Sequence, residues 1–462
     1  MSANTGVVTY GGLTHEVQQY YDSVIVQLPG TNNTKTTKYC FLARVDSWDD
    51  PNTEPNEEKN PPAPQLTQQN LKNTYKNMFV LKRVYPNDMC PLVDRIDWTE
   101  NTVYDYYRDD VDLLARDQNR KLIRQYYIKN KFDQVFVCLW NNNDSPATEE
   151  PYFAPSQMSE NLVYKGLDGY KWIYMYTIEG DTKQRFLDSE WMPVPLANTA
   201  GLKSNTVNSG NIPTLCVFDG GSGYFATNTT IHITGANTTM ATATPVIEDG
   251  IIKDVIMTNI GAGYISANVV VSSPTGSGAN VWAFVSPSNG HGSDPFEELA
   301  ASHIMVSQTF EGSEADLIPV DIKYRQIGFI INPSAPSSYP LQCENETYRL
   351  STDIIVSNGS EVYVSDEIVF QSPDSTLANA TFYATCLDFT ESINRLRVIN
   401  TYGTPNTNIT MIGTKSNAVR TTLSISNPDF TMYSGYITYI ENREGTQRSA
   451  DGTEQVRLIV GF

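Results

Sequence analysis

The sequence predicts a mainly β protein of the α+β type: a multi-domain β scaffold with a few N-terminal helices and two inserted β modules. Three observations predict this class. The chain has 462 residues, more than one hydrophobic core usually supports. Short β-branched and aromatic runs, bounded by Gly, Pro and Asn, recur along its length. The last stretch, Ser434 to Phe462, alternates apolar and polar residues with the period of two that is typical of strands.

Charge and hydropathy narrow the functional classes. Lys and Arg number 32 and Asp and Glu number 52, which gives a formal net charge of −20. Such a chain repels nucleic acid and anionic lipid. No run approaches the roughly 20 apolar residues that cross a bilayer, and Met1 to Tyr10 lacks the features of a signal peptide. We therefore expect a soluble protein with no membrane insertion, no nucleic-acid binding and no cleaved signal, whose partners are other proteins.

The cysteines predict no cross-linked framework. The two closest, Cys343 and Cys386, are 43 positions apart, and no C-x-x-C pair or histidine cluster accompanies them. This spacing favours isolated buried thiols in a reducing compartment over disulfides or a zinc site. The six are Cys40, Cys90, Cys138, Cys216, Cys343 and Cys386.

Residues 1–200 are expected to form the N-terminal part of the scaffold. Leu13 to Val26 and Gln65 to Met78 are predicted helices, the first from its three-to-four spacing of Val and Tyr. Lys38 to Val45 is a predicted strand. Asp46 to Pro64 is crowded with Asp, Glu, Asn and Pro and is expected to be a solvated loop, with a calcium site as the alternative.

Four more segments of this part are rich in β-branched and aromatic residues and are predicted strands. In the last of them aromatic side chains occupy alternate positions and would fill both faces of a sheet. The segments are Phe79 to Val84, Gln125 to Ile128, Gln134 to Leu139 and Gly169 to Ile178.

Residues 201–290 are expected to form the first inserted module. Gly221-Ser222-Gly223-Tyr224 recurs forty residues later as Gly261-Ala262-Gly263-Tyr264. The spacing indicates one and a half copies of a β unit. Glu248-Asp249-Gly250 is a predicted hairpin turn.

The remaining chain divides into three predicted parts. Residues 291–341 continue the scaffold core, with a helix around Pro295 to Ala301 and a strand over Tyr324 to Asn332. Residues 342–422 form the second module. Residues 423–462 close the scaffold as a C-terminal hairpin, whose connection from Glu441 to Thr453 is too charged to be buried.

No motif indicates catalysis or a cofactor. Gly221 to Ala226 satisfies G-x-G-x-x-A, but a strand, not a helix, is predicted after it, so a β-turn is favoured over dinucleotide binding. The four histidines lack metal or triad spacing. The adjacent carboxylate pairs lie in polar segments and are expected to be solvated. The pairs are Asp49-Asp50, Asp109-Asp110, Glu149-Glu150 and Glu297-Glu298.

Five short motifs in a fixed order carry a family resemblance. They are Phe41-Leu42-Ala43-Arg44 with Trp48, Asp94 to Trp98, Gly169 to Trp172, Tyr324 to Ile327, and Ser434 to Arg443 with its Y-I-E-N-R run. In this order they resemble the gene-eight-type baseplate wedge subunit of T-even-like contractile-tailed bacteriophages. Residues 201–290 and 342–422 are departures from that family, and they resemble β modules that recur in phage tail proteins.

The resemblance implies a structural role in the virion, in the tail baseplate, after assembly in the cytoplasm of the host bacterium. It implies a homodimer that bridges wedge proteins of the gene-six, gene-seven and gene-ten types, with no catalytic residues, no metal and no cofactor. The alternatives are a carbohydrate-binding tail adhesin, suggested by surface aromatics and the β repeat, and a tail-associated glycan hydrolase, which would need one of the carboxylate pairs.

Two segments are candidates for the interfaces, because they combine charge with aromatic character. One holds Arg95, Asp97 and Trp98, and the other holds Glu441, Asn442 and Arg443. The competing interpretation is that the same residues form intrachain ion pairs that hold a sheet edge.

Overall fold

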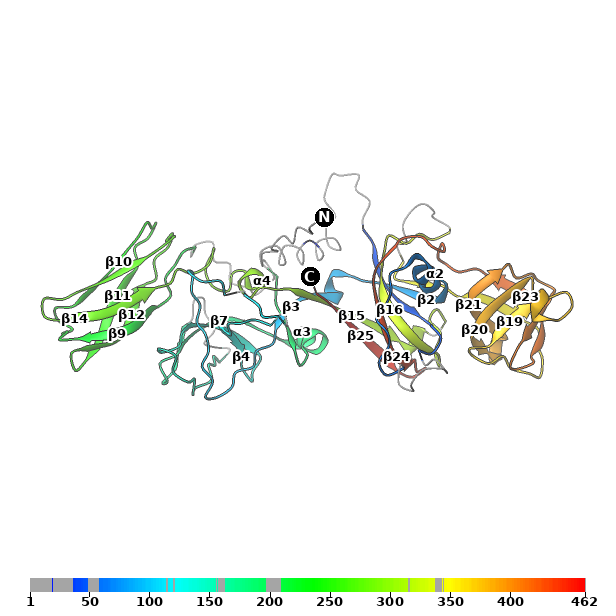
Figure 1. The fold of residues 1–462 in the computed structure, drawn as a ribbon, viewed down its shortest axis with the longest axis horizontal. Coiled ribbons are helices and arrows are strands. Elements are labelled where there is room, and N and C mark those ends of the chain that lie inside the picture. The colour runs from blue at the N-terminus through cyan, green and yellow to red at the C-terminus, as the bar shows by residue number, and fades with distance from the viewer. Residues whose placement is uncertain are drawn as a thin grey trace. The chain divides into compact units, whose positions relative to one another are not determined.

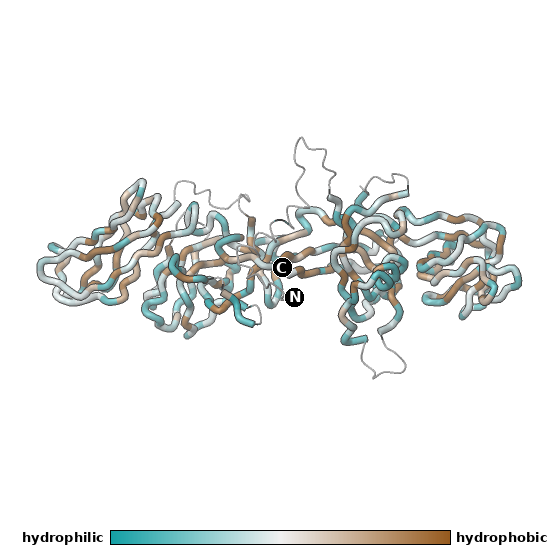
Figure 2. Tube along the Cα trace, turned by 45° about the horizontal axis from the view of Figure 1, so that its top comes forward, coloured by the Kyte–Doolittle hydropathy of each residue, from teal (hydrophilic) through white to brown (hydrophobic). Residues whose placement is uncertain are grey.

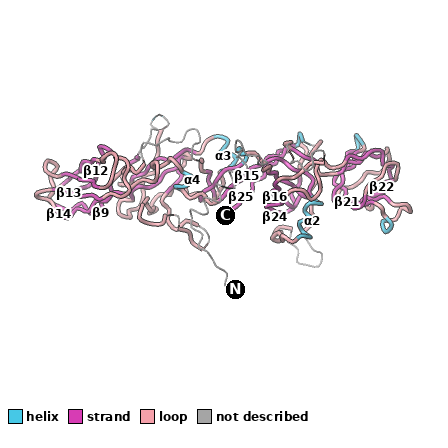
Figure 3. Tube along the Cα trace, turned by 90° about the horizontal axis from the view of Figure 1, so that it is seen from above, coloured by secondary structure: helices cyan, strands magenta, loops and turns pink. Residues whose placement is uncertain are grey.

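The computed structural model describes residues 19, 36–48, 58–113, 115–118, 121–154, 156, 163–196, 209–314, 316–336, 343 and 345–461. The chain divides into two compact units. Unit 1 comprises Met1–Gln19, Cys90–Met305 and Ile459–Phe462, and unit 2 comprises Tyr20–Met89 and Val306–Leu458. Strands dominate both units (Figures 1 and 3), so the mainly β class is confirmed.

The helices are short. Gln65 to Met78 is confirmed as α2 (Gln68–Asn77), whose first turn is capped by the Thr67 side chain. The helix near Pro295 is confirmed as α4 (Pro295–Glu298). Sequence did not predict α3 (Gly180–Phe186), and the Leu13 to Val26 prediction, apart from Gln19, lies outside the described residues. The 3₁₀ turns are η1 (Pro86–Asp88), η3 (Gly312–Glu314), η4 (Leu377–Asn379) and η5 (Glu391–Ile393).

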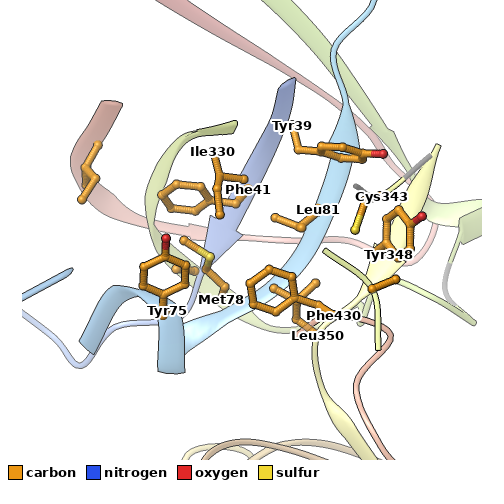
Figure 4. Packing of buried hydrophobic residues seen from close by; sticks show 13 residues of the cluster. Tyr39, Phe41, Tyr75, Met78, Leu81, Ile330, Cys343, Tyr348, Leu350 and Phe430 are labelled. Atoms are coloured by element: carbon orange, nitrogen blue, oxygen red, sulfur yellow. The ribbon is translucent and has the colours of Figure 1, made fainter. Parts of the chain in front are cut away.

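A five-stranded antiparallel sheet forms the centre of unit 2. Its order is β17 (Thr347–Arg349), β2 (Met78–Arg83), β1 (Lys38–Ala43), β16 (Lys323–Ile331) and β24 (Tyr436–Gln447). Every residue of β1 is buried, which its apolar residues on both faces allow. Tyr39, Phe41, Leu81 and Ile330 pack with the helix residue Tyr75 in one core (Figure 4).

A closed barrel forms a second part of unit 2. Its strands follow the order β18 (Thr352–Val356), β21 (Arg395–Gly403), β20 (Phe382–Thr390), β19 (Ile368–Gln371), β22 (Thr410–Gly413) and β23 (Val419–Ser426). Val369, Phe382, Leu396 and Met411 belong to its interior core.

Unit 1 contains a four-stranded sheet of order β4 (Tyr127–Lys129), β5 (Gln134–Trp140), β7 (Lys171–Thr177) and β6 (Val163–Lys165). Its core joins Phe136, Tyr170 and Trp172. Every residue of β5 and most residues of β7 are buried, as the β-rich pattern of residues 125–139 and 169–178 predicts. Hydrophobic stretches alternate with hydrophilic ones along the Cα trace (Figure 2).

The Gly-x-Gly-Tyr repeat also lies in unit 1, as three strand pairs: β9–β14, β10–β13 and β11–β12. The strands are β9 (Leu215–Ser222), β10 (Thr230–Thr234), β11 (Thr242–Glu248), β12 (Ile251–Asn259), β13 (Asn268–Ser272) and β14 (Ser277–Ala283). Each copy supplies three strands, so the expected one and a half copies become two. The turn is confirmed, with Asp249 and Gly250 at positive φ between β11 and β12.

The two copies hold each other through their tyrosines. The Tyr224 hydroxyl accepts a hydrogen bond from the Ala279 amide at 3.2 Å, and the Tyr264 hydroxyl accepts one from the Ala241 amide at 2.9 Å. Each bond runs from one copy to the other. Exchanging the copies maps the β9–β14 pair onto β12–β11 and the β10–β13 pair onto itself, so the repeat module has pseudo-two-fold symmetry.

The C-terminal strands correct one prediction. A four-stranded sheet has the order β25 (Thr453–Gly461), β15 (His303–Glu311), β3 (Met89–Asp94) and β8 (Trp191–Pro193). Val456 and Leu458 are buried, as their alternation predicts. However, β24 and β25 belong to different sheets and are not neighbours in either, so they do not form a hairpin.

The charged connection from Glu441 to Thr453 was also predicted wrongly. Residues as far as Gln447 continue β24, because an edge strand tolerates polar side chains. Arg448 is fully buried. Its guanidinium pairs with Glu454 at 2.8 Å and donates hydrogen bonds to the carbonyl oxygens of Pro319 and Glu311. These contacts offset the free-energy cost of burying the charge.

Candidate interaction surfaces

The first predicted interface segment is tied to its own sheet. Arg95 pairs with Asp97 at 2.8 Å, and Asp97 also contacts Lys129 Nζ at 3.2 Å. Burial raises the pKa of Asp97, but hydrogen bonds from Arg95 and Lys129 outweigh burial and leave this pKa below its usual range. The carboxylate is therefore charged at neutral pH and half exposed.

Trp98 lies on the inner side of this segment. Its backbone amide donates to the Lys129 carbonyl at 2.9 Å, and its ring packs against the core that contains Trp172. The indole Nε1 is buried and has no hydrogen-bond partner among the described residues. Trp98 thus contributes mainly to the packing of unit 1.

The second predicted segment lies on the edge strand β24. Asn442 accepts a hydrogen bond from Gln326 Nε2 at 2.8 Å and donates to the Pro62 carbonyl at 2.7 Å. Arg443 Nε contacts Glu441 Oε1 at 2.6 Å. These intrachain contacts are of the kind that the competing interpretation predicts, and the interface role of both segments stays a prediction.

Two side chains from the acidic segment cover this edge. Trp48 Nε1 donates to the Arg443 carbonyl at 2.7 Å, and Glu58 Oε1 accepts from the Gly445 amide at 3.0 Å. Glu58 also pairs with Arg325 at 2.8 Å. Burial raises the pKa of Glu58, but hydrogen bonds from Trp48 and Arg325 outweigh it and lower this pKa. Glu58 is thus a structural residue in a segment that was predicted to be solvated.

Three of the singled-out motifs meet in the unit 2 sheet. Leu42 on β1 is in register with Ile327 on β16, which is in register with Glu441 on β24. Trp48 joins the same group through its bond to Arg443. Segments separated by nearly the whole chain are therefore direct neighbours.

The barrel carries an uncharged row on its outer surface. Tyr402, Tyr383, Phe370, Ile412 and Val419 are successive register partners across β21, β20, β19, β22 and β23. Paired residues on neighbouring strands face the same side. Tyr402, Tyr383 and Val419 are 59%, 38% and 61% exposed, and the two tyrosine rings stack at 4.9 Å. Sequence reasoning missed this row because its members come from five separate strands.

The carboxylates of the adjacent acidic pairs contact different partners. Asp110 pairs with Arg108, and Asp109 accepts from the Val285 amide. Glu150 pairs with Lys131, whereas Glu298 contacts the buried His291. Asp49, Asp50 and His15 lie outside the described residues.

The glycine motif, His232, His303 and the cysteines have contacts typical of structural residues. Gly221 lies at the end of β9 and Gly223 in the bend that follows, both at positive φ. Strand β10 and not a helix comes next, as predicted, so the motif does not have the helix N-terminus that dinucleotide binding requires. His232 contacts Thr230 within β10, and the His303 ring lies against Trp191. The six cysteines are free thiols.

No family model and no curated protein matches this chain. In the part that the structure describes, no group of three or more His, Cys, Asp or Glu residues could hold a metal ion. Among the same residues, no helix is long and apolar enough to cross a membrane. Function therefore has to be inferred from where the motifs and the exposed apolar and aromatic residues lie.

Proposed function

We propose that this chain is a structural subunit of the baseplate wedge in a contractile phage tail, of the gene-eight type. It acts through protein interfaces and not as an enzyme. It bridges neighbouring wedge proteins of the gene-six, gene-seven and gene-ten types, and it does so as a homodimer in the virion.

One observation carries the proposal. The motifs that resemble the family meet in two cores: Phe41 to Arg44, Tyr324 to Ile327 and Ser434 to Arg443 in the unit 2 sheet, and Asp94 to Trp98 with Gly169 to Trp172 in unit 1. If the motifs belong to one shared scaffold, they are expected to contact one another.

The uncharged row on the barrel supports the same role. Exposed aromatic residues are typical of protein interfaces. Tyr383 and Tyr402 offer two stacked, exposed rings on the closed barrel, and Val419 is exposed at the other end of the row, beyond the buried Phe370. Barrel and repeat module add contact area to the scaffold without interrupting its sheets.

Co-expression with the three wedge partners tests the proposal. The chain should co-purify with at least one partner and sediment with it as a defined complex. A chain that stays monomeric at its mass of 51.5 kDa and binds none of the partners would overturn the proposal.

Arg443→Ala separates the two interpretations of the β24 segment. If Arg443 contacts a partner, this variant should weaken co-sedimentation and leave the melting temperature of the free chain nearly unchanged. If its bond to Glu441 only supports the sheet edge, the variant should lower the melting temperature slightly and leave assembly intact. Both residues are about one-third exposed, so the stability effect should stay below about 1 kcal/mol.

A further inference from the structure

Five aromatic rings form a connected cluster where the repeat module packs against β5 in unit 1. Trp140 lies edge-on to Tyr106 at 5.4 Å and to Phe218 at 4.8 Å, and Phe218 lies edge-on to Trp282 at 6.4 Å. Phe284 contacts Tyr106 at 5.8 Å. We refer to Tyr106, Trp140, Phe218, Trp282 and Phe284 as the aromatic cluster.

The aromatic cluster runs from the interior to the surface. Trp140 and Phe284 are buried, Phe218 is half-buried and Trp282 is 51% exposed. The indole Nε1 of Trp282 donates to Asn280 Oδ1 at 2.7 Å. The exposed ring is therefore held in place by Asn280 and by its contact with Phe218. A fixed aromatic ring binds a ligand with little loss of conformational freedom.

Three planar polar side chains lie on β14, on β9 and in the loop that contacts β9. Asn280 lies on the same strand as Trp282, and Asp219 is its register partner on β9. The Asn143 amide donates to the Val217 carbonyl at 3.3 Å and to the Phe218 carbonyl at 3.4 Å. Asn143, Asp219 and Asn280 are all exposed.

The loop that carries Asn143 has an uncommon backbone. Asn142, Asn143 and Asp144 have successive φ angles of 52°, 56° and 59°. Asn141 holds this loop, donating to the Tyr104 carbonyl at 2.9 Å and to Asp144 Oδ1 at 2.8 Å. Left-handed residues that the surrounding structure fixes in this way cluster at ligand sites.

The charges around the aromatic cluster favour a neutral ligand over an anionic one. Arg108 and Asp110 form an ion pair at 2.8 Å, which leaves two exposed carboxylates, Asp144 in the loop and Asp219 on β9, in a chain whose net charge is −20. Phosphates, nucleic acid and acidic sugars are therefore disfavoured. A neutral pyranose fits, because its C–H face packs on an indole while its vicinal hydroxyls pair with amides and a carboxylate.

We propose that the aromatic cluster is a binding site for a neutral glycan, with Trp282 as the stacking platform and Asn143, Asp219 and Asn280 as hydroxyl partners. This activity is additional to the wedge role and does not depend on it. A host-surface polysaccharide and a free oligosaccharide share this chemistry.

A glycan array probed with the purified full chain tests the proposal. Neutral oligosaccharides of glucose, galactose, mannose and N-acetylglucosamine should include at least one that binds, and titration should change the Trp fluorescence. Trp282→Ala should weaken binding at least about tenfold, as expected for a central aromatic contact. Asn143→Ala should weaken it less, and Trp282→Phe should restore part of it.

Phe225→Ala is the matched control, since it removes an aromatic side chain of similar exposure (58%, against 51% for Trp282) from the same module and should bind like the wild type. Far-UV circular dichroism verifies that each variant is folded. Binding of both host polysaccharide and free oligosaccharide would support the proposal, as would binding of either alone. An array without neutral ligands, or a folded Trp282→Ala variant that binds like the wild type, would overturn it.

Discussion

The repeat module and the barrel are stabilised by different kinds of contact. In the repeat module, glycines at positive φ form the turns and two tyrosine hydroxyls connect the copies. In the barrel, buried charged groups hold the loops: Glu367 is fully buried and Arg420 is 2% exposed. The stabilising contacts of the repeat module come from a short motif that recurs in the sequence. Those of the barrel join residues that are distant in the sequence. The comparison predicts that the barrel is more sensitive to single substitutions.

The largest expected effect is that of Glu367→Ala in the barrel. Glu367 accepts hydrogen bonds from the amides of Val364, Lys415 and Ser416 at 2.8–2.9 Å. Its removal leaves buried donors without a partner, so the barrel should lose about 3–5 kcal/mol. Hydrogen exchange of β19 and β22 would measure the loss.

Glu391→Ala, at an exposed barrel residue, should change the same exchange rates little. Equal protection in the wild type and Glu367→Ala would show that buried charge does not hold the barrel, which would remove the contrast between the modules.

The next effect is that of Tyr224→Phe and Tyr264→Phe in the repeat module. Each variant removes one hydroxyl acceptor and should cost about 1–2 kcal/mol. Because the copies are related by pseudo-symmetry, the two losses should be similar and should appear in the hydrogen exchange of β9 to β14. A large loss from one tyrosine and none from the other would contradict the structural equivalence of the copies.

The smallest effect is the acid sensitivity of the repeat module. Asp254 contacts Lys171 at 2.7 Å. Burial raises the pKa of Asp254, but the Lys171 and Lys165 charges outweigh burial and hold this pKa below the ordinary 3.8. A lowered carboxyl pKa stabilises the folded state above the unfolded-state pKa, and this contribution is lost as the pH falls through the folded-state value.

The protection factors of β12, which compare measured exchange with the intrinsic rate at each pH, should therefore fall below about pH 4 in the wild type. Asp254→Asn should flatten this dependence and be less stable at pH 7, whereas the exposed Asp249→Asn should keep the wild-type profile. A wild-type profile in Asp254→Asn would mean that another group anchors the module.

Local patterns were sufficient to predict several strands, but they missed β3, β8 and β15, which form one sheet with β25. β1, β7 and β16 are apolar runs bounded by turn residues, and the Asp249-Gly250 turn carries its own signal. Short polar helix α3 was missed because only Phe186 is buried in it, which leaves no apolar period.

Contacts between distant residues could not be predicted. Glu58 finds Arg325 and the buried Arg448 finds the Glu311 carbonyl only after the sheets have formed. The aromatic cluster likewise combines residues of β5, β9 and β14 with two residues outside the strands, Tyr106 and Phe284. Trp282 alone could not be told from a core residue, and its exposure is a property of the fold.

The proposal that this chain is a wedge scaffold is tested most directly by cryo-electron microscopy of the intact phage tail. The account predicts density for both units within each baseplate wedge, as a pair of copies in contact with the neighbouring wedge proteins. Density for this chain only at the tips of tail fibres, or none in the baseplate, would contradict it.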